Sequence, residues 1–190
     1  MASSTCSSSS FSLLLSIALF ISFFRPPVLV NGDADLIQRT CKSTKHYDLC
    51  VSSLKSDPTS PKADTKGLAA IMVGVGIANA TATSSYLSSQ VTSINASDMQ
   101  VLKKVFKECA DKYSNSGNSL QSAFQDIAAE SYDYAYMHVM AAADYPNACH
   151  SAFKRYGALS YPPDLAARED GLKRICDVVL GIIDLMLADK

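Results

Sequence analysis

The chain has 190 residues, of which 17 are Lys or Arg and 18 are Asp or Glu, so its formal net charge is −1. It lacks the basic excess that is typical of proteins that bind nucleic acid or an anionic membrane surface, and we expect neither as a partner of the mature chain. Gly and Pro are sparse after residue 67 and Ala is abundant, which favours helices over sheet.

An apolar run near the N-terminus, FSLLLSIALFISFF over residues 11–24, predicts a signal peptide. The run is short for a membrane span, and Val30 and Gly32 supply the small residues that signal peptidase prefers at −3 and −1. We therefore predict a signal peptide over residues 1–32 and a mature, single-domain chain from Asp33. Because no Lys or Arg precedes the run, a retained signal anchor is the alternative.

Five cysteines remain in the mature chain, and four of them are expected to pair in an oxidising compartment. Several connectivities are open, but spacing favours Cys41–Cys50 and Cys109–Cys149, each pair lying on either side of a predicted turn. Cys176 lies on the apolar stripe of the last helix, so we expect a buried free thiol, with a reactive thiol as the alternative. No His or Cys cluster has metal-ligand spacing, and no metal or cofactor is expected.

Two N-glycosylation sequons begin at Asn79 and Asn95. Asn95 lies at a predicted helix boundary, where a glycan would be exposed, whereas Asn79 lies within a predicted helix beside its apolar stripe. Asn95 is therefore the better candidate, and an unmodified surface Asn is the alternative for both.

The first helical elements are two short helices over residues 33–55, which fold into a hairpin at Lys45-His46. A turn-rich hinge follows at residues 56–61. The first of four longer helical patterns then covers about residues 64–94. Its predicted inward face comprises Leu68, Ile71, Val75, Ala78, Ala82 and Tyr86.

The second long pattern begins at Ser97, and Gln100 three residues later completes a capping-box pattern. Its apolar period stays in phase across the polar residues 114–119, so one continuous helix is predicted through Gly117. The predicted inward face comprises Leu102, Phe106, Cys109, Tyr113, Leu120, Phe124 and Ile127.

The third long helix is predicted from about Tyr132 to Arg155, with a kink at Pro146. The fourth begins at Pro162-Pro163-Asp164, with Asp164 as the N-cap. The predicted inward residues are Tyr136, Val139 or Met140, Ala143, Cys149 and Phe153 of the third helix, and Leu165, Leu172, Ile175, Val179, Ile182 and Met186 of the fourth.

Four amphipathic helices joined by short connections predict an all-α, up-down-up-down four-helix bundle over residues 62–190. The helical hairpin of residues 33–61 precedes it.

The second and third long helices form the segment on which a functional hypothesis can be built. If they fold back near residue 129, midway between Cys109 and Cys149, the disulfide lies about 20 residues, or roughly 30 Å, from the turn. Such a hairpin presents an aromatic and acidic segment at its end, Tyr132-Asp133-Tyr134. Tyr132 and Tyr134 cannot both point inward, so one of them is expected to be available to a partner.

No catalytic pattern is present in the sequence: it contains no Gly-x-Ser-x-Gly, no phosphate-binding loop and no His-Glu-x-x-His. The three histidines, His46, His138 and His150, are scattered, and the adjacent acids Glu169 and Asp170 are expected to be solvated. The chain is therefore not expected to be an enzyme.

The order of these features resembles the plant invertase and pectin methylesterase inhibitor superfamily. The resemblance covers the whole mature chain and rests on Thr40-Cys41, Asp48-Leu49-Cys50, the hinge, and one Cys on each of the second and third bundle helices. Finer stretches, among them Lys55-Ser56-Asp57-Pro58 and Asp144-Tyr145-Pro146-Asn147, are similar to the cell-wall and vacuolar inhibitors of β-fructosidase within it.

The resemblance implies a non-enzymatic bundle whose first two and next two cysteines pair while the fifth stays free. It also implies a secreted inhibitor located in the cell wall or vacuole, with a plant cell-wall or vacuolar acid invertase as its partner, or alternatively a pectin methylesterase. Some invertase inhibitors plug the sucrose pocket with Pro-Lys-Phe at the turn between the second and third bundle helices. The corresponding stretch here is Tyr132-Asp133-Tyr134, which keeps an aromatic residue and lacks the proline and lysine.

A bundle that carries a small ligand in its core is a further alternative from another functional class. Bulky residues on the predicted inward faces, Phe106, Phe124 and Phe153, favour a filled core instead.

Overall fold

The computed structural model describes residues 32–95, 99–157 and 159–189, so the predicted signal peptide lies outside the described residues apart from Gly32. These parts of the chain contain helices and no strand, which confirms the all-α class. In chain order the helices are α2 Gly32–Lys42, α3 Tyr47–Ser56, the short 3-10 helix η1 Ser60–Lys62, α4 Thr65–Ser93, α5 Gln100–Ala128, α6 Tyr132–Arg155 and α7 Pro163–Ala188.

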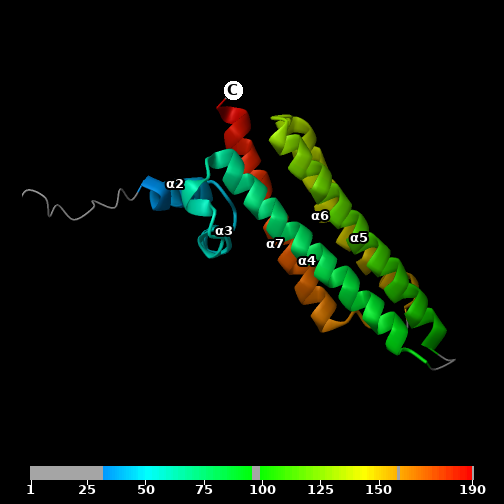
Figure 1. Cartoon of the computed structure of the whole chain (residues 1–190). Coiled ribbons are helices and arrows are strands. Elements are labelled where there is room, and N and C mark those ends of the chain that lie inside the picture. The colour runs from blue at the N-terminus through cyan, green and yellow to red at the C-terminus, as the bar shows by residue number, and fades with distance from the viewer. Residues whose placement is uncertain (1–31, 96–98, 158, 190) are drawn as a thin grey trace, which may run out of the picture. The chain divides into compact units, whose positions relative to one another are not determined.

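The four long helices form the predicted bundle. α4 packs against α5 and α7, and α6 packs against the same two helices, so each long helix has two neighbours. Figure 1 shows that the α5–α6 turn, the start of α4 and the C-terminal end of α7 lie at one end of the bundle. This is the arrangement that an up-down-up-down order produces.

The hairpin of α2 and α3 is closed by the Cys41–Cys50 disulfide, with a Cα–Cα distance of 5.6 Å. Its turn lies against α7: His46 Nε2 is 3.2 Å from Asp177 Oδ2. A Cβ atom added at Gly181 of α7 would come within 3.0 Å of the backbone oxygen of Ser43. Glycine therefore allows the hairpin turn to approach α7 this closely.

The predicted hinge after α3 is an ordered connection. Thr59 N donates to Asp57 Oδ1 at 2.8 Å, a short turn of the kind that Asp favours. Ser60 is buried, and its Oγ donates to the backbone oxygen of Leu54 at 2.5 Å. These bonds fix the segment onto the end of α3.

The inward face predicted for α4 is wrong at Ala78 and Ala82, which are exposed. Leu68 is buried, and Ile71, Val75 and Tyr86 are partly buried and pack against the core. Apolar and small residues occur all round this helix, so periodicity could not select a face. The buried residues are Leu68, Ala69, Met72, Val73, Gly76, Ala80, Thr83 and Leu87.

The same composition gives α4 the length and hydropathy of a membrane span, with a mean hydropathy of 1.4 over its most apolar window. In the described structure the helix packs between α5 and α7.

The helix α5 is continuous through Gly117, as predicted, and the predicted capping residue Ser97 lies outside the described residues. Phe124 is 40% exposed, so its predicted inward position is wrong. Ala123 and Ile127 are buried instead at this level of the helix.

The helix α6 runs from Tyr132 to Arg155 with Pro146 inside it, and the kink at Pro146 remains a prediction. Of the two alternatives at its centre, Val139 is buried and Met140 is 53% exposed. In α7, all six residues predicted to face inward are buried. Pro163 is the first residue of α7 and Pro162 precedes it as the N-cap, so the N-cap predicted at Asp164 is wrong.

Glu169 is also not solvated, contrary to the prediction, because it is only 9% exposed. Tyr161 Oη donates to its Oε2 at 2.7 Å, and Lys173 Nζ donates to its Oε1 at 2.5 Å. Burial raises the pKa of Glu169, but the hydrogen bonds from Lys173 and Tyr161 outweigh burial and hold the pKa below its ordinary value. The ring of Tyr161 also stacks on His150 of α6, so this polar cluster joins the base of α6 to α7.

Candidate target-binding site

The α5–α6 hairpin is cross-linked far from its turn. The Cys109–Cys149 disulfide joins two fully buried residues whose Cα atoms lie 4.7 Å apart. Cys109 lies 19 residues before the end of α5 at Ala128, which is about 28 Å of helix. The predicted disulfide and the predicted position of the turn are both present in the structure.

Side chains hold the two helices together beyond the disulfide. Ser116 Oγ donates to the backbone oxygen of Ala142 at 2.6 Å, in a buried position. Closer to the turn, His138 Nδ1 lies 2.7 Å from Asp126 Oδ2. The hairpin is therefore fixed along its length rather than only at the disulfide.

The turn itself depends on Glu130, which has a positive φ of 59°. Glu130 N donates to Ile127 O at 3.1 Å, and Ser131 N donates to Asp126 O at 2.8 Å. These two bonds form a Schellman motif, in which the residue at the position of Glu130 is usually glycine. The sequence has no Gly or Asn here, so the turn residues gave no local signal, and the turn was located from the order of the helices and the spacing of the cysteines.

The three predicted site residues lie in the first turn of α6 and point in different directions. Tyr132 is 9% exposed, whereas Tyr134 is 64% exposed. Asp133 is exposed as well. The prediction that only one of the two tyrosines points inward is confirmed, and the outward residues are Asp133 and Tyr134.

The end of the bundle adds residues that the sequence did not single out. A hollow of about 380 Å³ lies between the start of α4, the α5–α6 turn and the end of α7. Lys66 Nζ lies 2.8 Å from Glu130 Oε1, and this hydrogen bond raises the pKa of Lys66 above its ordinary value. The lining residues are Asp64, Thr65, Lys66, Glu130, Tyr132, Met186 and Asp189.

The order of the helices could have indicated this composite surface. In an up-down-up-down bundle, the start of the first helix and the end of the fourth lie beside the turn between the second and third. We call the surface formed by residues 64–66, 129–134 and 186–189 the tip surface.

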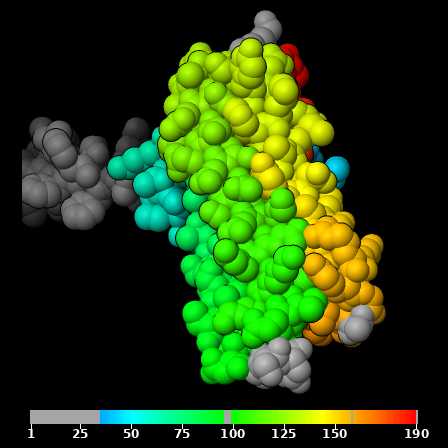
Figure 2. Space-filling model, turned by 90° about the vertical axis from the view of Figure 1, so that its right-hand side faces the viewer, coloured from blue at the N-terminus to red at the C-terminus, as the bar shows by residue number. Residues whose placement is uncertain are grey.

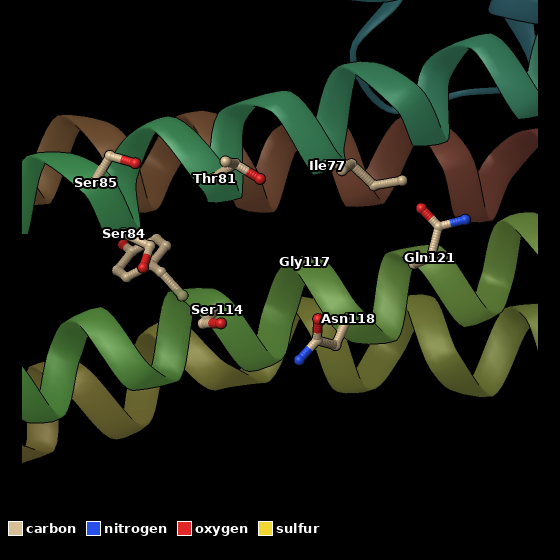
Figure 3. Close-up of a pocket in the computed structure, with 9 residues that line it drawn as sticks. Ile77, Thr81, Ser84, Ser85, Ser114, Gly117, Asn118 and Gln121 are labelled. Carbon is tan, nitrogen blue, oxygen red and sulfur yellow. The ribbon is translucent and has the colours of Figure 1, made fainter.

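A second hollow, of about 230 Å³, lies between α4 and α5 (Figure 3). Figure 3 shows Thr81, Ser84 and Ser85 of α4 opposite Ser114, Asn118 and Gln121 of α5. Ser84 Oγ already donates to the backbone oxygen of Ala110 at 2.9 Å. Tyr113 also lines this hollow, and burial raises the pKa of its hydroxyl well above the ordinary value, so the group stays protonated. The described residues that line it include no carboxylate, histidine or lysine.

The structure places the remaining predicted residues away from the tip surface. Cys176 is a buried free thiol, and burial raises its pKa to about 12, which makes it a poor nucleophile. Asn79 faces α7, with its Oδ1 buried and its Nδ2 3.6 Å from the position of a Cβ at Gly171. Asn95 is exposed, although the rest of its sequon lies outside the described residues. Among the described residues, no three His, Cys, Asp or Glu side chains are grouped to hold a metal.

Comparison with known proteins places this fold among inhibitors. The chain is 47% identical to the cell wall / vacuolar inhibitor of fructosidase 2 of Arabidopsis thaliana over 179 residues, which cover 93% of this chain and 98% of that protein. It is 37% identical to pectinesterase inhibitor 28 of Oryza sativa subsp. japonica over 158 residues, covering 80% of this chain and 70% of the relative.

A solved structure has the same fold. The crystal structure of a mutant form of a pectin methylesterase inhibitor from Arabidopsis matches with a TM-score of 0.62 and 23% identity, covering 76% of this chain and 93% of that one. The sequence profile described as plant invertase/pectin methylesterase inhibitor matches residues 35–182. The chain therefore belongs to the plant invertase/pectin methylesterase inhibitor family, whose members are inhibitors and not enzymes.

Proposed function

We propose that this chain is a secreted protein inhibitor of acid invertase, and that its tip surface blocks the entry of sucrose into the active site of the enzyme. The observation that carries the proposal is the 47% identity to a fructosidase inhibitor over almost the whole of both chains. The geometry supports it, because the hairpin holds Asp133 and Tyr134 outward at the end of the bundle.

The mechanism follows from the chemistry of the target. Glycoside hydrolysis uses two carboxylates that flank the scissile bond in a pocket. A rigid protein surface that covers the pocket excludes the substrate without taking part in the reaction. Tyr134 suits such a surface, since an exposed tyrosine buries a large area at a small cost in side-chain entropy.

The test is inhibition of purified cell-wall and vacuolar invertases at about pH 5, measured as loss of sucrose hydrolysis. The wild-type chain should inhibit at least one of them. The double variant Asp133→Ala/Tyr134→Ala should weaken inhibition by about tenfold or more, as expected for an interface tyrosine. Tyr132 is left unchanged because it is largely buried, and its removal would also disturb packing.

A matched control is Tyr47→Ala in α3, another partly exposed tyrosine at 39%. It should inhibit as the wild type does. Full inhibition of invertase by the Asp133→Ala/Tyr134→Ala variant would contradict a role for the tip surface, and a wild-type chain inactive against both invertases would contradict the proposed target.

A pectin methylesterase is the second candidate target, favoured by the 37% identity to pectinesterase inhibitor 28 of rice. A parallel methylesterase assay with the same variants separates the two targets. If the docking surface for that enzyme is formed by other faces of the bundle, Asp133→Ala/Tyr134→Ala should leave methylesterase inhibition unchanged.

Secretion and glycosylation belong to the same proposal. We expect residues 1–32 to be removed as a signal peptide, and the mature protein to reach the cell wall or the vacuole. Asn95 is the expected glycan acceptor because it is exposed, whereas Asn79 packs against α7. Intact-mass measurement before and after glycosidase treatment, repeated on Asn95→Gln, tests both assignments.

A further inference from the structure

The outer face of α6 carries a row of four residues, Asp133, Met137, Met140 and Asp144, which we call the α6 row. Successive members are four, three and four residues apart, and this spacing places them on one side of a helix. Met137 is 64% exposed and Met140 is 53% exposed. Both aspartates are exposed as well, so two methionines lie in the open between two acids.

These methionines are not explained by the core of the bundle. Neither belongs to the buried cluster of apolar residues or to the partly buried residues packed against it. Tyr134, beside the row and one turn before Met137, is 64% exposed. Single exposed apolar residues are common on protein surfaces, whereas three large ones close together on one helix make a candidate interaction surface. Methionine is flexible and polarizable, which suits a surface that packs against another protein.

Acidic residues outnumber basic ones in the hairpin that carries the row, although Lys66 of α4 pairs with Glu130 at its turn. Residues 110–148, the part of the α5–α6 hairpin beyond the disulfide, contain five acidic residues and one basic residue, Lys112, whereas the rest of the mature chain contains 13 acidic and 15 basic residues. The five acids are Asp111, Asp126, Glu130, Asp133 and Asp144. The α5–α6 hairpin beyond its disulfide is therefore acidic in a protein that is otherwise close to neutral. Figure 2 shows the end of α5 and the start of α6, in yellow-green, side by side at the top of the face that contains these two helices.

The pattern of charges argues against a second copy of this chain as the partner. In a two-fold antiparallel pairing of the row, Met137 would meet Met140, but Asp133 would lie opposite Asp144 at both ends. Like charges placed opposite one another oppose association. A partner surface with basic residues at both ends of an apolar patch would instead place opposite charges against Asp133 and Asp144.

We propose that the target enzyme presents an apolar patch flanked by Lys or Arg side chains, and that the α6 row docks along it. This inference rests on the proposed function and extends the contact from the tip surface for about three turns along α6. The apolar centre supplies contact area, and the two aspartates fix the register of α6 on the partner through charge.

The first experiment measures the inhibition constant of Met137→Ala/Met140→Ala against the enzyme that the wild type inhibits. Inhibition should weaken by about tenfold to 100-fold, because two exposed side chains at the centre of an interface are truncated. Met99→Ala is the matched control, since Met99 is 42% exposed at the start of α5, and it should inhibit as the wild type does. An unchanged melting temperature would show that the double variant is folded.

The second experiment tests the charges. Asp144→Lys should slow association with the enzyme and weaken inhibition about tenfold at low salt, and the difference from wild type should shrink as the salt concentration rises. Asp48→Lys, an exposed acid in α3, is the matched control and should change neither quantity.

The outcomes separate this inference from the proposed function. If the wild type inhibits and Met137→Ala/Met140→Ala inhibits equally well, the α6 row is not a docking surface, although the proposed function stands. If the wild type inhibits neither invertase nor methylesterase, both are overturned. If the wild type sediments as a dimer that the double methionine variant abolishes, the occupant is a second copy and the inference is wrong.

Discussion

The protein contains two helical hairpins, each closed by one disulfide, and they use their turns in opposite ways. In the α2–α3 hairpin the cysteines are nine residues apart, and the turn between them lies against α7. In the α5–α6 hairpin they are 40 residues apart, and the turn lies at the end of the bundle. The disulfide with the short separation closes a turn that is packed against α7. The disulfide with the long separation lies far from its turn, and that turn remains available to a partner.

The difference shows how one element can be both rigid and accessible. The base of α5–α6 is held by the disulfide and by the polar cluster of Glu169, Tyr161 and Lys173, which joins α6 to α7. The exposed residues Asp133, Tyr134 and Met137 are therefore held in place by the helix that carries them, and do not depend on packing contacts of their own side chains. A surface that is already ordered loses little conformational entropy on binding.

Removal of the disulfides should give the largest losses of unfolding free energy, and the two losses should show which disulfide stabilises the protein more. By loop-closure entropy, Cys109→Ala/Cys149→Ala should cost about 4 kcal/mol of unfolding free energy and Cys41→Ala/Cys50→Ala about 2.7 kcal/mol. Urea unfolding of both double variants measures the difference. Equal losses, or a larger loss for the shorter loop, would contradict the entropic basis of the comparison.

Gly181 tests whether the α2–α3 turn must lie against α7. A Cβ there would come within 3.0 Å of Ser43 O and 3.1 Å of Thr44 Cα, which are backbone atoms that cannot rotate away. We expect Gly181→Ala to cost about 1–3 kcal/mol, as overpacking usually does. Gly74→Ala is the control, because nothing lies within 4 Å of that position, and it should stabilise α4 by about 0.5–1 kcal/mol. A neutral Gly181→Ala would show that the turn can move away from α7 without loss of stability.

Glu169 tests the anchorage of the base of α6, and its effect depends on pH. Its folded-state pKa lies below the ordinary value of 4.5, so the carboxylate stabilises the fold above that value. This contribution is lost as the pH falls through the lowered pKa. Glu169→Gln should therefore cost about 1–3 kcal/mol at about pH 7, and the gap from wild type should close in stronger acid.

The control for Glu169 is Asp170→Asn on the same helix. Asp170 has a side chain that is 69% exposed and lies 3.6 Å from Arg174, so its loss should cost about 0.5 kcal/mol or less. Denaturant unfolding of both variants at several pH values measures the gap. A gap that widens towards acid would contradict the direction of the Glu169 pKa.

The sequence predicted the parts of the fold where polar and apolar residues separate clearly. In α7, charged residues interrupt the apolar ones at helical spacing, and all six residues predicted to face inward are buried. In α4, apolar and small residues occur on every face, and only Leu68 of the predicted face is buried. The buried face of α4 includes small residues such as Gly76 and Ala80. Small residues contribute little to a hydrophobic periodicity, so the pattern did not indicate this face.

For the candidate site, the sequence predicted the position of the turn but not all of the residues that surround it. The order of the helices and the spacing of Cys109 and Cys149 located the turn, but neither could indicate that Lys66 of α4 reaches Glu130. The sequence left open whether Val139 or Met140 faces the core, and it gave no direction for Met137. Only the packed structure shows that Val139 occupies the core position between them.

The smallest expected effect concerns the turn that carries the tip surface. Glu130 adopts a left-handed conformation at a φ of 59°, which costs about 1–2 kcal/mol for a residue with a Cβ and little for glycine. Glu130→Gly should therefore stabilise the protein by about 0.5–1 kcal/mol, after the loss of an exposed ion pair with Lys66 that contributes about 0–1 kcal/mol. Glu130→Ala loses the pair and keeps the Cβ, so it should be slightly less stable than wild type. If thermal unfolding showed Glu130→Gly to be the less stable of the two, contacts of the Glu130 side chain, rather than the backbone, would determine the turn.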